Sequence, residues 1–385
     1  QVPDSSGRET INMTTISSKD DLITSEKDLI TGARNLLINC AELTPEQTLV
    51  IICEDPALGW YDQNVAEALE NEARDMGITP TVLHVGAPGN DKNPEVVDAV
   101  GNHDCALFLA RIGDQDRFAD PVPGKKTIMC YARNAAMLAS TYGRADHRAF
   151  LQLKQAVNDI LLAATNIRMT CAKGTDISGS VSKSDREEPG DVSVRRFPLG
   201  VPQPLDASEM SGRVALANFL TPTGSKMYEP ASVQIEEVVF AEVQEGRIAD
   251  LTGNINIVGD IRDHYQMVSK KFGIQDDNVH SFHAGIHPGC SYDTTAQADP
   301  DRWSNTVFTN PRVLHFHTCG DYAPGEICWM VIDHTLSVDG KNLWQDGRMC
   351  LDDFNATRQC LEDWPELKAM FAEPAQAIGL GNEAI

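Results

Sequence analysis

Positive charge is scarce in this sequence. Its 385 residues include 32 lysines and arginines against 56 aspartates and glutamates, which gives a net charge of −24. The phosphates of nucleic acids and the anionic surfaces of membranes repel so acidic a chain. We therefore expect no nucleic-acid partner and no membrane partner.

The sequence also lacks long apolar runs. Runs such as TLVIIC (residues 48–53) are far shorter than the roughly 20 residues that span a bilayer. No charged segment followed by an apolar one is seen near the first residue, so no secretory signal is predicted. The ten cysteines form no CxxC pair, and several lie inside apolar runs. We expect a cytoplasmic protein with reduced, mostly buried thiols.

Several common catalytic motifs are absent. No GxGxxG or GxxxxGK[ST] follows a predicted strand, and neither HExxH nor a serine nucleophile elbow occurs. A cysteine nucleophile stays open as an alternative, because Cys290 and Cys319 lie near histidines in the sequence. Such a thiol would need a lowered pKa.

The first half of the chain alternates predicted strands and helices. QTLVIICED (47–55) is a continuous, largely β-branched run, typical of a buried strand, and residues 60–78 have helical periodicity. NPEVVDAVGN (93–102) predicts a short helix capped by Asn93. This alternation predicts an α/β N-terminal domain with a mostly parallel sheet over residues 16–165.

The second half has a different pattern. Short alternating segments such as GRVALANF (212–219) and ASVQIEEVVF (231–240) are separated by turn residues, which predicts antiparallel hairpins. One amphipathic helix is predicted at about residues 260–274. We expect an α+β C-terminal domain rich in antiparallel strands over residues 166–385. Residues 1–15 lack periodicity and are predicted to be a flexible tail or a cloning remnant.

Histidines are concentrated in the second half, where seven of the ten lie between residues 264 and 334. Imidazole is the commonest metal ligand and a frequent general base, so this clustering favours a metal or acid–base site. The alternative is that these histidines simply lie on the protein surface and are clustered by chance. The seven are His264, His280, His283, His287, His315, His317 and His334.

Three of these histidines lie in a predicted hairpin. RVLHFHTCG (312–320) is expected to form one strand, DYAPG (321–325) the turn and EICWMVIDHT (326–335) the return strand. His315 and His317 are two residues apart and therefore face the same side of their strand.

Glu326 and Cys328 share a face of the return strand by the same rule, and the turn brings them opposite residues 317 and 319. Two imidazoles and one carboxylate are the ligand set of non-haem Fe(II) oxygenases, and zinc or manganese also accepts it. The alternative is a polar pocket in which Glu326 is a solvated strand end.

Two other histidine segments are less informative. Glycine and proline in NVHSFHAGIHPGC (278–290) predict an irregular loop with one or two inward histidines. Asp333 and His334 are adjacent, so in a regular strand one is buried and the other faces solvent.

Several segments together resemble the aminopeptidase-T-like metallopeptidase fold over roughly residues 20–350. Besides the alternating first half, they are CAKGTDISGSV (171–181), VVFAEVQEGRIADLTGN (238–254) and WMVIDHTLSVDGKNLWQDG (329–347). Within that superfamily, HAGIHPGC (283–290) resembles the segment of 2,5-dihydroxypyridine 5,6-dioxygenase that carries an iron-binding histidine. His283 is at the matching position. That enzyme is a mononuclear non-haem Fe(II) dioxygenase that opens a dihydroxylated pyridine ring.

The resemblance also shows where this chain departs from its relatives. The peptidases place a carboxylate ligand in a Gly-Glu-Val-Phe-type segment, but the best match here, RFPLGVPQPLD (196–206), has Gly200 and Val201 without a glutamate. Their second carboxylate position falls on His283. Both differences favour one metal rather than two.

The dioxygenase carries a His-x-Asp on its last ligand strand, and this motif falls on residues 326–328 here. The resemblance therefore implies that Glu326 replaces one ligand, while His315 or His317 supplies another.

Together these features predict a mononuclear metal-dependent enzyme, an Fe(II) dioxygenase that opens a hydroxylated, nitrogen-containing aromatic ring. Mn or Zn are the other metals considered. The expected substrate is a small molecule, as in aromatic catabolism, and family likeness implies a homo-oligomer. The predicted metal ligands are His283, His315, His317 and Glu326, with His287 as the general base.

Two alternatives stay open. One is a metal-dependent hydrolase of a small molecule or peptide on the same fold. The other is a non-catalytic binding protein.

Overall fold

The computed structural model describes residues 19–381, except positions 90, 91, 116, 118, 119, 188, 189, 224–227 and 321–324. The predicted tail, residues 1–15, and most of the predicted hairpin turn lie outside the described residues. The helices of at least four residues are α1 (Lys19–Arg34), η1 (Asn35–Cys40), α2 (Gln63–Asp75), α3 (Pro94–Asn102), η3 (Arg111–Asp114), α4 (Ala135–Ala139), α5 (Thr141–Arg144), α6 (His147–Ala163), α7 (Lys183–Glu187), α8 (Ile255–Phe272), α9 (Pro300–Val307), α10 (Asn355–Asp363) and α11 (Pro365–Ala372). Short helical turns are η2 (Pro56–Leu58), η4 (Ala296–Ala298) and η5 (Leu351–Asp353).

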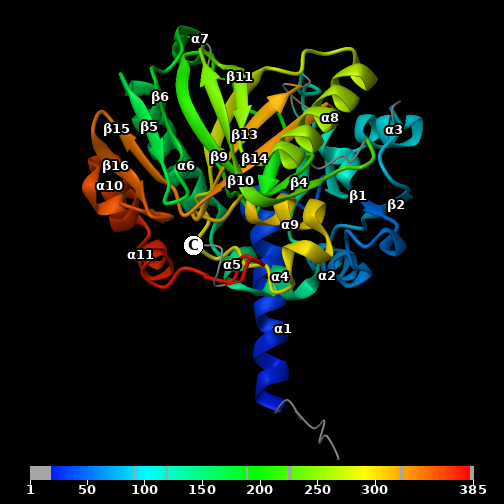
Figure 1. Ribbon diagram of the computed structural model, residues 1–385. Helices are drawn as coiled ribbons and strands as arrows, with labels where there is room; N and C mark the ends of the chain where they lie inside the picture. Colours follow the sequence, from blue (N-terminus) through cyan, green and yellow to red (C-terminus); the bar gives the residue numbers. More distant parts are fainter. Residues whose placement is uncertain are drawn as a thin grey trace, which may run out of the picture.

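The first half folds around a five-stranded parallel sheet, as predicted (Figure 1). Its strand order is β2 (Thr81–Val85), β1 (Leu49–Glu54), β3 (Cys105–Leu109), β4 (Lys126–Cys130) and β7 (Arg195–Phe197). β1 is buried along its whole length, as its apolar run requires. The predicted cap of α3 is also confirmed, because Asn93 Oδ1 accepts a hydrogen bond from the Glu95 amide at 3.0 Å.

One strand of this sheet comes from far along the chain. β7 follows α6 and the first strands of the second half, yet it pairs in parallel with β4, with Arg196 opposite Met129. The predicted boundary at residue 165 lies just after α6, but the first sheet takes a strand from beyond it. β7 thus connects the α/β sheet to the β-rich half.

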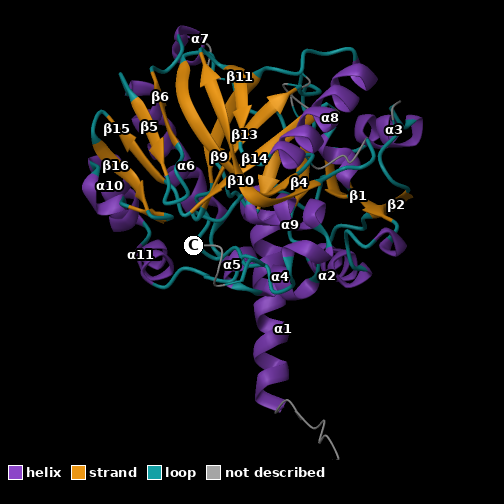
Figure 2. Cartoon of the chain, in the orientation of Figure 1, coloured by secondary structure: helices purple, strands orange, loops and turns teal. Residues whose placement is uncertain are grey.

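The second half is antiparallel, as predicted, and forms two sheets (Figure 2). The larger has the order β11 (Arg247–Thr252), β10 (Val233–Gln244), β9 (Met210–Leu220), β6 (Asp176–Gly179), β5 (Ile167–Thr170), β15 (Thr335–Val338), β16 (Lys341–Gln345) and β17 (Arg348–Met349). The smaller has the order β14 (Glu326–Ile332), β13 (Val313–Cys319), β12 (Val279–Ala284) and β8 (Leu205–Asp206). A single bridge between Thr221 and Cys328 connects the end of β9 to β14.

One segment differs from its prediction. Residues 279–284, expected to be part of an irregular loop, form strand β12. The strand forms because it pairs with β13, more than thirty residues later, and with β8. The glycines and Pro288 of this segment come after the strand. His283 is therefore held in a ladder instead of a loop.

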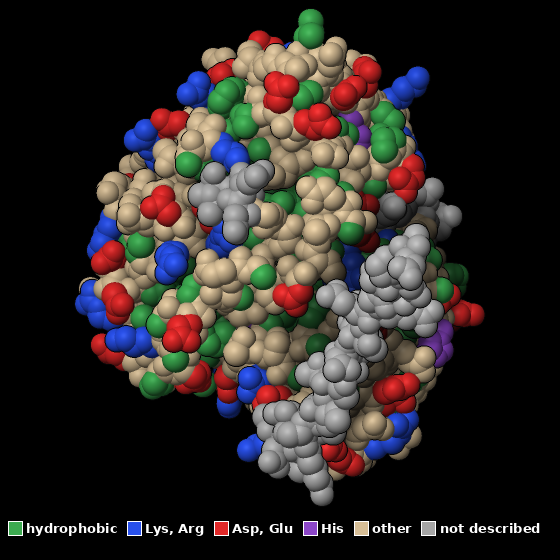
Figure 3. Space-filling view, turned by 60° about the horizontal axis from the view of Figure 1, so that its bottom comes forward, with side chains coloured by type: hydrophobic (Ala, Val, Ile, Leu, Met, Phe, Trp, Pro, Cys, Tyr) green, Lys and Arg blue, Asp and Glu red, His purple; other side chains and the backbone are tan. Residues whose placement is uncertain are grey.

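Surface features agree with the composition. Among the described residues, no helix is long and apolar enough to cross a membrane. On the face shown in Figure 3, Lys and Arg side chains are scattered among Asp and Glu and do not gather into one patch. The first turns of α1 project from the rest of the chain in Figure 1, whereas its later turns pack against α2, α4 and α5.

Gly285, which directly follows β12, provides a test of how closely this part of the chain packs. A Cβ added at Gly285 would lie 2.1 Å from the backbone oxygen of Asn310, so Gly285→Ala requires the backbone to move. We expect a loss of about 1–3 kcal/mol in the free energy of unfolding. Gly259→Ala in helix α8 is the control, because its Cβ would meet nothing within 4 Å. It should stabilise the protein by about 0.5–1 kcal/mol. Urea denaturation measures both; equal effects would contradict the packing described.

Candidate metal centre

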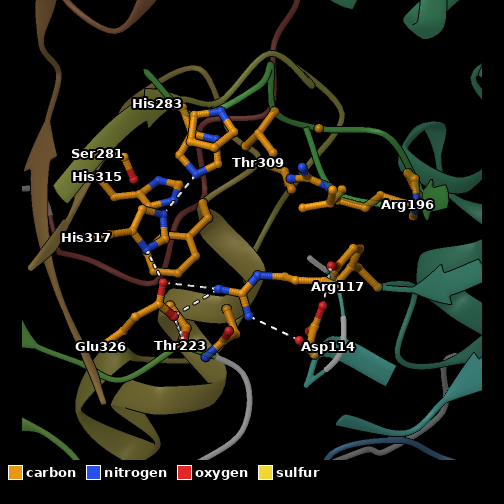
Figure 4. A pocket seen from close by; sticks show the side chains of 18 residues that line it. Asp114, Arg117, Arg196, Thr223, Ser281, His283, Thr309, His315, His317 and Glu326 are labelled. Carbon is orange, nitrogen blue, oxygen red and sulfur yellow. Dashed lines mark hydrogen bonds and ion pairs between the residues drawn. The ribbon is translucent and has the colours of Figure 1, made fainter. Parts of the chain in front are cut away.

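Three buried histidines converge on adjacent strands. His283 on β12 is the direct cross-strand partner of His315 on β13, and His317 lies opposite Ser281. Directly paired side chains share one face of an antiparallel sheet, so strand parity places all three rings together. Each ring offers one nitrogen, and these three atoms lie within 4.8 Å of one another (Figure 4). We call these residues the histidine triad.

The outer nitrogens of two triad rings have acceptors as partners. His283 Nδ1 lies 3.1 Å from the carbonyl oxygen of Pro202, and His317 Nδ1 lies 3.0 Å from Glu326 Oε1. A carbonyl or a carboxylate can only accept, so each Nδ1 carries a hydrogen. Burial keeps the pKa of His283 low, so the lone pair of this ring is on Nε2. This assignment of the tautomers follows from the partners.

The two Nε2 atoms face each other at 3.1 Å. Two lone pairs at this distance repel unless a proton or a cation lies between them. Metal–imidazole bonds of about 2.1 Å at angles of 90–109° would separate two ligand nitrogens by roughly 3.0–3.4 Å. The separation therefore fits joint coordination of one metal ion.

His315 supplies the third ring. It stacks on Phe308 with ring centroids 4.0 Å apart, and its centroid lies 4.1 Å from that of His283. Its buried Nδ1 has no hydrogen-bond partner within the described part of the chain. Burial and neighbouring imidazoles hold the pKa of both His283 and His315 well below the usual range. Both rings are thus neutral, the form that binds metal.

Glu326 is placed behind the triad. Its carboxylate accepts hydrogen bonds from Arg117 Nη2 at 2.9 and 3.1 Å and from the hydroxyl of Thr223, besides His317. Burial alone would raise its pKa, but the charge of Arg117 and then His317 lowers it to about 2. The carboxylate is therefore ionised, and its bonds are directed away from the point where the triad converges.

Glu326, the fourth predicted ligand, lies outside the group of atoms that converge, which comes from His283, His315 and His317. Cys328 lies opposite His317 in the ladder, and Glu326 lies opposite Cys319. The Glu326 side chain therefore reaches His317 diagonally across the ladder and contacts Nδ1, the nitrogen on the outer edge of the ring. By accepting this hydrogen bond, Glu326 orients His317.

His287, the predicted general base, lies elsewhere. Its ring stacks on Phe150 with centroids 4.0 Å apart and packs edge-on against Tyr142 at 4.7 Å. Burial lowers its pKa to about 3, and it is not among the described residues that line the pocket. Beyond β12 the His287 amide donates to the Thr309 carbonyl oxygen, and the ring lies against α5 and α6.

The triad opens into a pocket that the α/β half completes. Arg117, Tyr131 and Arg196 follow or lie on strands of the parallel sheet, and all line this pocket. None of the three was predicted from the sequence. Ligands of open α/β sheets bind beyond the carboxyl ends of the strands, and that rule applied to β3 and β4 would have indicated the region. The apolar part of the lining is Val192, Pro198, Val201, Pro204 and Phe308.

The remaining candidates do not join the triad. Asp333 pairs with Arg312 at 2.6 and 2.7 Å, and its neighbour His334 is buried. Burial raises the pKa of the thiols of Cys290 and Cys319 to about 12, which disfavours a cysteine nucleophile.

Comparisons with known proteins were made on both sequence and structure. No protein-family profile and no curated protein sequence matches the chain. Two solved structures are similar. 2,5-Dihydroxypyridine dioxygenase from Pseudomonas putida KT2440 has a TM-score of 0.58 at 12% identity, covering 87% of this chain and 99% of that chain. AmpT from Thermus thermophilus has a TM-score of 0.46 at 13% identity, covering 84% and 99%.

The first likeness shows a shared fold. The resemblance that the sequence indicated is thereby confirmed at the level of architecture, with a parallel sheet in the first half and antiparallel sheets in the second. At such low identity, the roles of individual residues rest on the geometry of this chain.

Cation binding by the triad can be measured directly with Co²⁺, whose absorption spectrum reports its ligands. We expect the metal-free protein to bind one Co²⁺ per chain. His317→Ala should weaken this binding by more than about 100-fold, because loss of an outer partner alone costs roughly 10- to 100-fold. His84→Ala is the control, since His84 is exposed on β2. Equal Co²⁺ affinity in wild type and His317→Ala would contradict the assignment.

A second prediction concerns acid stability. Burial lowers the pKa of His264 on α8 to about 4, so the folded state disfavours protonation while the unfolded state binds a proton near pH 6.5. Stability from this group is present above pH 6.5 and is lost as pH falls towards 4. His264→Leu should flatten the pH dependence of the unfolding free energy by about 1 kcal/mol per pH unit between pH 6 and 5. Urea titrations at several pH values measure this slope, and an unchanged slope would refute the assignment.

Proposed function

We propose that this chain is a mononuclear metal-dependent enzyme, and more specifically an Fe(II) dioxygenase that opens a hydroxylated, nitrogen-containing aromatic ring. One observation carries the proposal: the Nε2 atoms of His283 and His317 face each other across 3.1 Å, beside a third ring. His283, His315 and His317 would hold the metal. Imidazole ligands suit iron and zinc well, and manganese is the third candidate.

A bound Fe(II) would supply a Lewis-acidic, redox-active centre for a substrate hydroxyl and O₂. The chain's own residues have separate roles. Glu326 holds the Nδ1 proton of His317 and thereby keeps its Nε2 free for coordination. Phe308 and Val201 give the pocket an apolar wall that suits an aromatic ring and excludes water. His287 has no role in this proposal.

The ring-opening activity is supported by the shared fold with 2,5-dihydroxypyridine dioxygenase, together with the apolar pocket beside the triad. A small-molecule substrate, a homo-oligomeric state and a cytoplasmic location belong to the same proposal.

A metal-dependent hydrolase is the second candidate. The observation that favours it is the all-histidine donor set, since three neutral imidazoles are also the ligands with which zinc lowers the pKa of a bound water to about 7.

The two candidates differ in their need for oxygen. Protein purified anaerobically is expected to contain about one iron per chain and to consume O₂ when 2,5-dihydroxypyridine is added. His317→Ala should lose both properties, whereas His84→Ala should keep them. Oxygen-electrode traces and metal analysis provide the readout.

Less than half a metal per chain after Fe(II) addition would overturn the metalloenzyme proposal. Metal-dependent turnover of ester or peptide substrates without O₂ uptake would replace the dioxygenase with the hydrolase.

A further inference from the structure

Arg196 is a nearly buried cation whose charge is only weakly compensated by the residues that the structure describes. Its side chain is 10% exposed, and its ion pair with Asp191 is long, at 3.4 Å. Asp191 also pairs with Lys154, so its single charge is shared between two cations. The Arg196 guanidinium, with its fork of donors, is therefore only weakly engaged.

The direction of the Arg196 side chain follows from strand β7. Its neighbour Arg195 faces the other side, where it donates to the Cys40 carbonyl oxygen at 2.6 Å and pairs with Glu42 at 2.8 Å. Alternation along the strand turns Arg196 into the pocket, which it lines together with the triad. In Figure 4, Arg196 and Glu326 lie on opposite sides of this pocket.

The other charges of the pocket have stronger partners. Arg117 pairs with Glu326 at 2.9 Å, and Asp114 accepts a hydrogen bond from the Tyr131 hydroxyl at 2.8 Å. Burial is the main cause that lowers the pKa of His283 and His315, and the charge of Arg196 is a further cause for both. The triad consists of three imidazoles and no carboxylate, so this donor set would not offset the charge of a bound divalent metal. Metal and Arg196 together would then attract an anionic ligand.

We infer that Arg196 is a specificity-determining residue that binds a carboxylate on the substrate, so that the substrate class is a small hydroxylated aromatic carboxylate. This inference rests on the proposed function for the orientation of the ring. The planar guanidinium matches a carboxylate in geometry and charge. The ring would lie against Phe308 and Val201, with its hydroxyl towards the triad.

A matched pair of probes tests the inference. 6-Hydroxypyridine-3-carboxylate and 2-hydroxypyridine differ only by the carboxylate. Their affinities are measured by calorimetry on both metal-free and Co²⁺-loaded protein. Wild type should bind the carboxylate probe at least about tenfold more tightly than its partner. Arg196→Gln should bring this ratio close to one without changing the affinity for 2-hydroxypyridine, and Arg196→Lys should keep part of the preference.

Arg195→Gln is the matched control on the same strand, and its ratio should equal that of wild type. A wild-type ratio near one, or no measurable binding of the carboxylate probe, overturns the role of Arg196. The role is also overturned if Arg196→Gln prefers the carboxylate probe as strongly as wild type does. None of these results contradicts the proposed metal site if Co²⁺ binds. Conversely, if Co²⁺ does not bind, the proposed function fails while the ratio in metal-free protein still decides on Arg196.

Discussion

The contact between the carboxylate of Glu326 and Nδ1 of His317 determines what the histidine triad can do. Because an ionised carboxylate only accepts, it fixes the hydrogen of His317 on the outer nitrogen and leaves the inner one free. The Pro202 carbonyl does the same for His283. Without these two acceptors either ring could turn its N–H inward, and a cation would find a donor where it needs a lone pair.

A buried carboxylate must itself be compensated, and the compensation connects both halves of the protein. Arg117 follows η3 in the α/β half, Thr223 follows β9, and Glu326 begins β14. The Tyr228 hydroxyl also donates to the backbone carbonyl of Glu326 at 2.5 Å. Removing one partner from a buried pair costs about 3–5 kcal/mol, because the other charge is left in a medium of low polarity. The arrangement of the site is therefore tied to the docking of the α/β sheet against the β-rich half.

Local periodicity explains which features could be predicted from sequence. Strand runs, the cap at Asn93 and the common face of His315 and His317 depend on neighbours within a few residues, and all were predicted. The strand character of β12 depends on pairing with β13, which comes more than thirty residues later. The pairing of residues 326 and 328 with 319 and 317 was predicted, but the direction of the Glu326 carboxylate depends on Arg117 and Thr223, which are far away in the sequence. Arg117 and Arg196 reach the pocket only through the packing of the two halves, so their role could not be predicted from local patterns.

The separation of neutral and charged groups in this pocket has a chemical consequence. Neutral imidazoles leave the charge of a bound divalent metal undiminished, whereas a carboxylate ligand would cancel part of it. Here the carboxylate of Glu326 lies behind His317, where it would make the imidazole a stronger donor to a bound metal. Arg117 neutralises Glu326, which leaves Arg196 as the weakly compensated charge on the opposite side. With a metal bound, the pocket would present positive charge at two separated points with an apolar wall between them. Such an arrangement would suit a flat ring with an anionic group at one end and a metal-binding oxygen at the other.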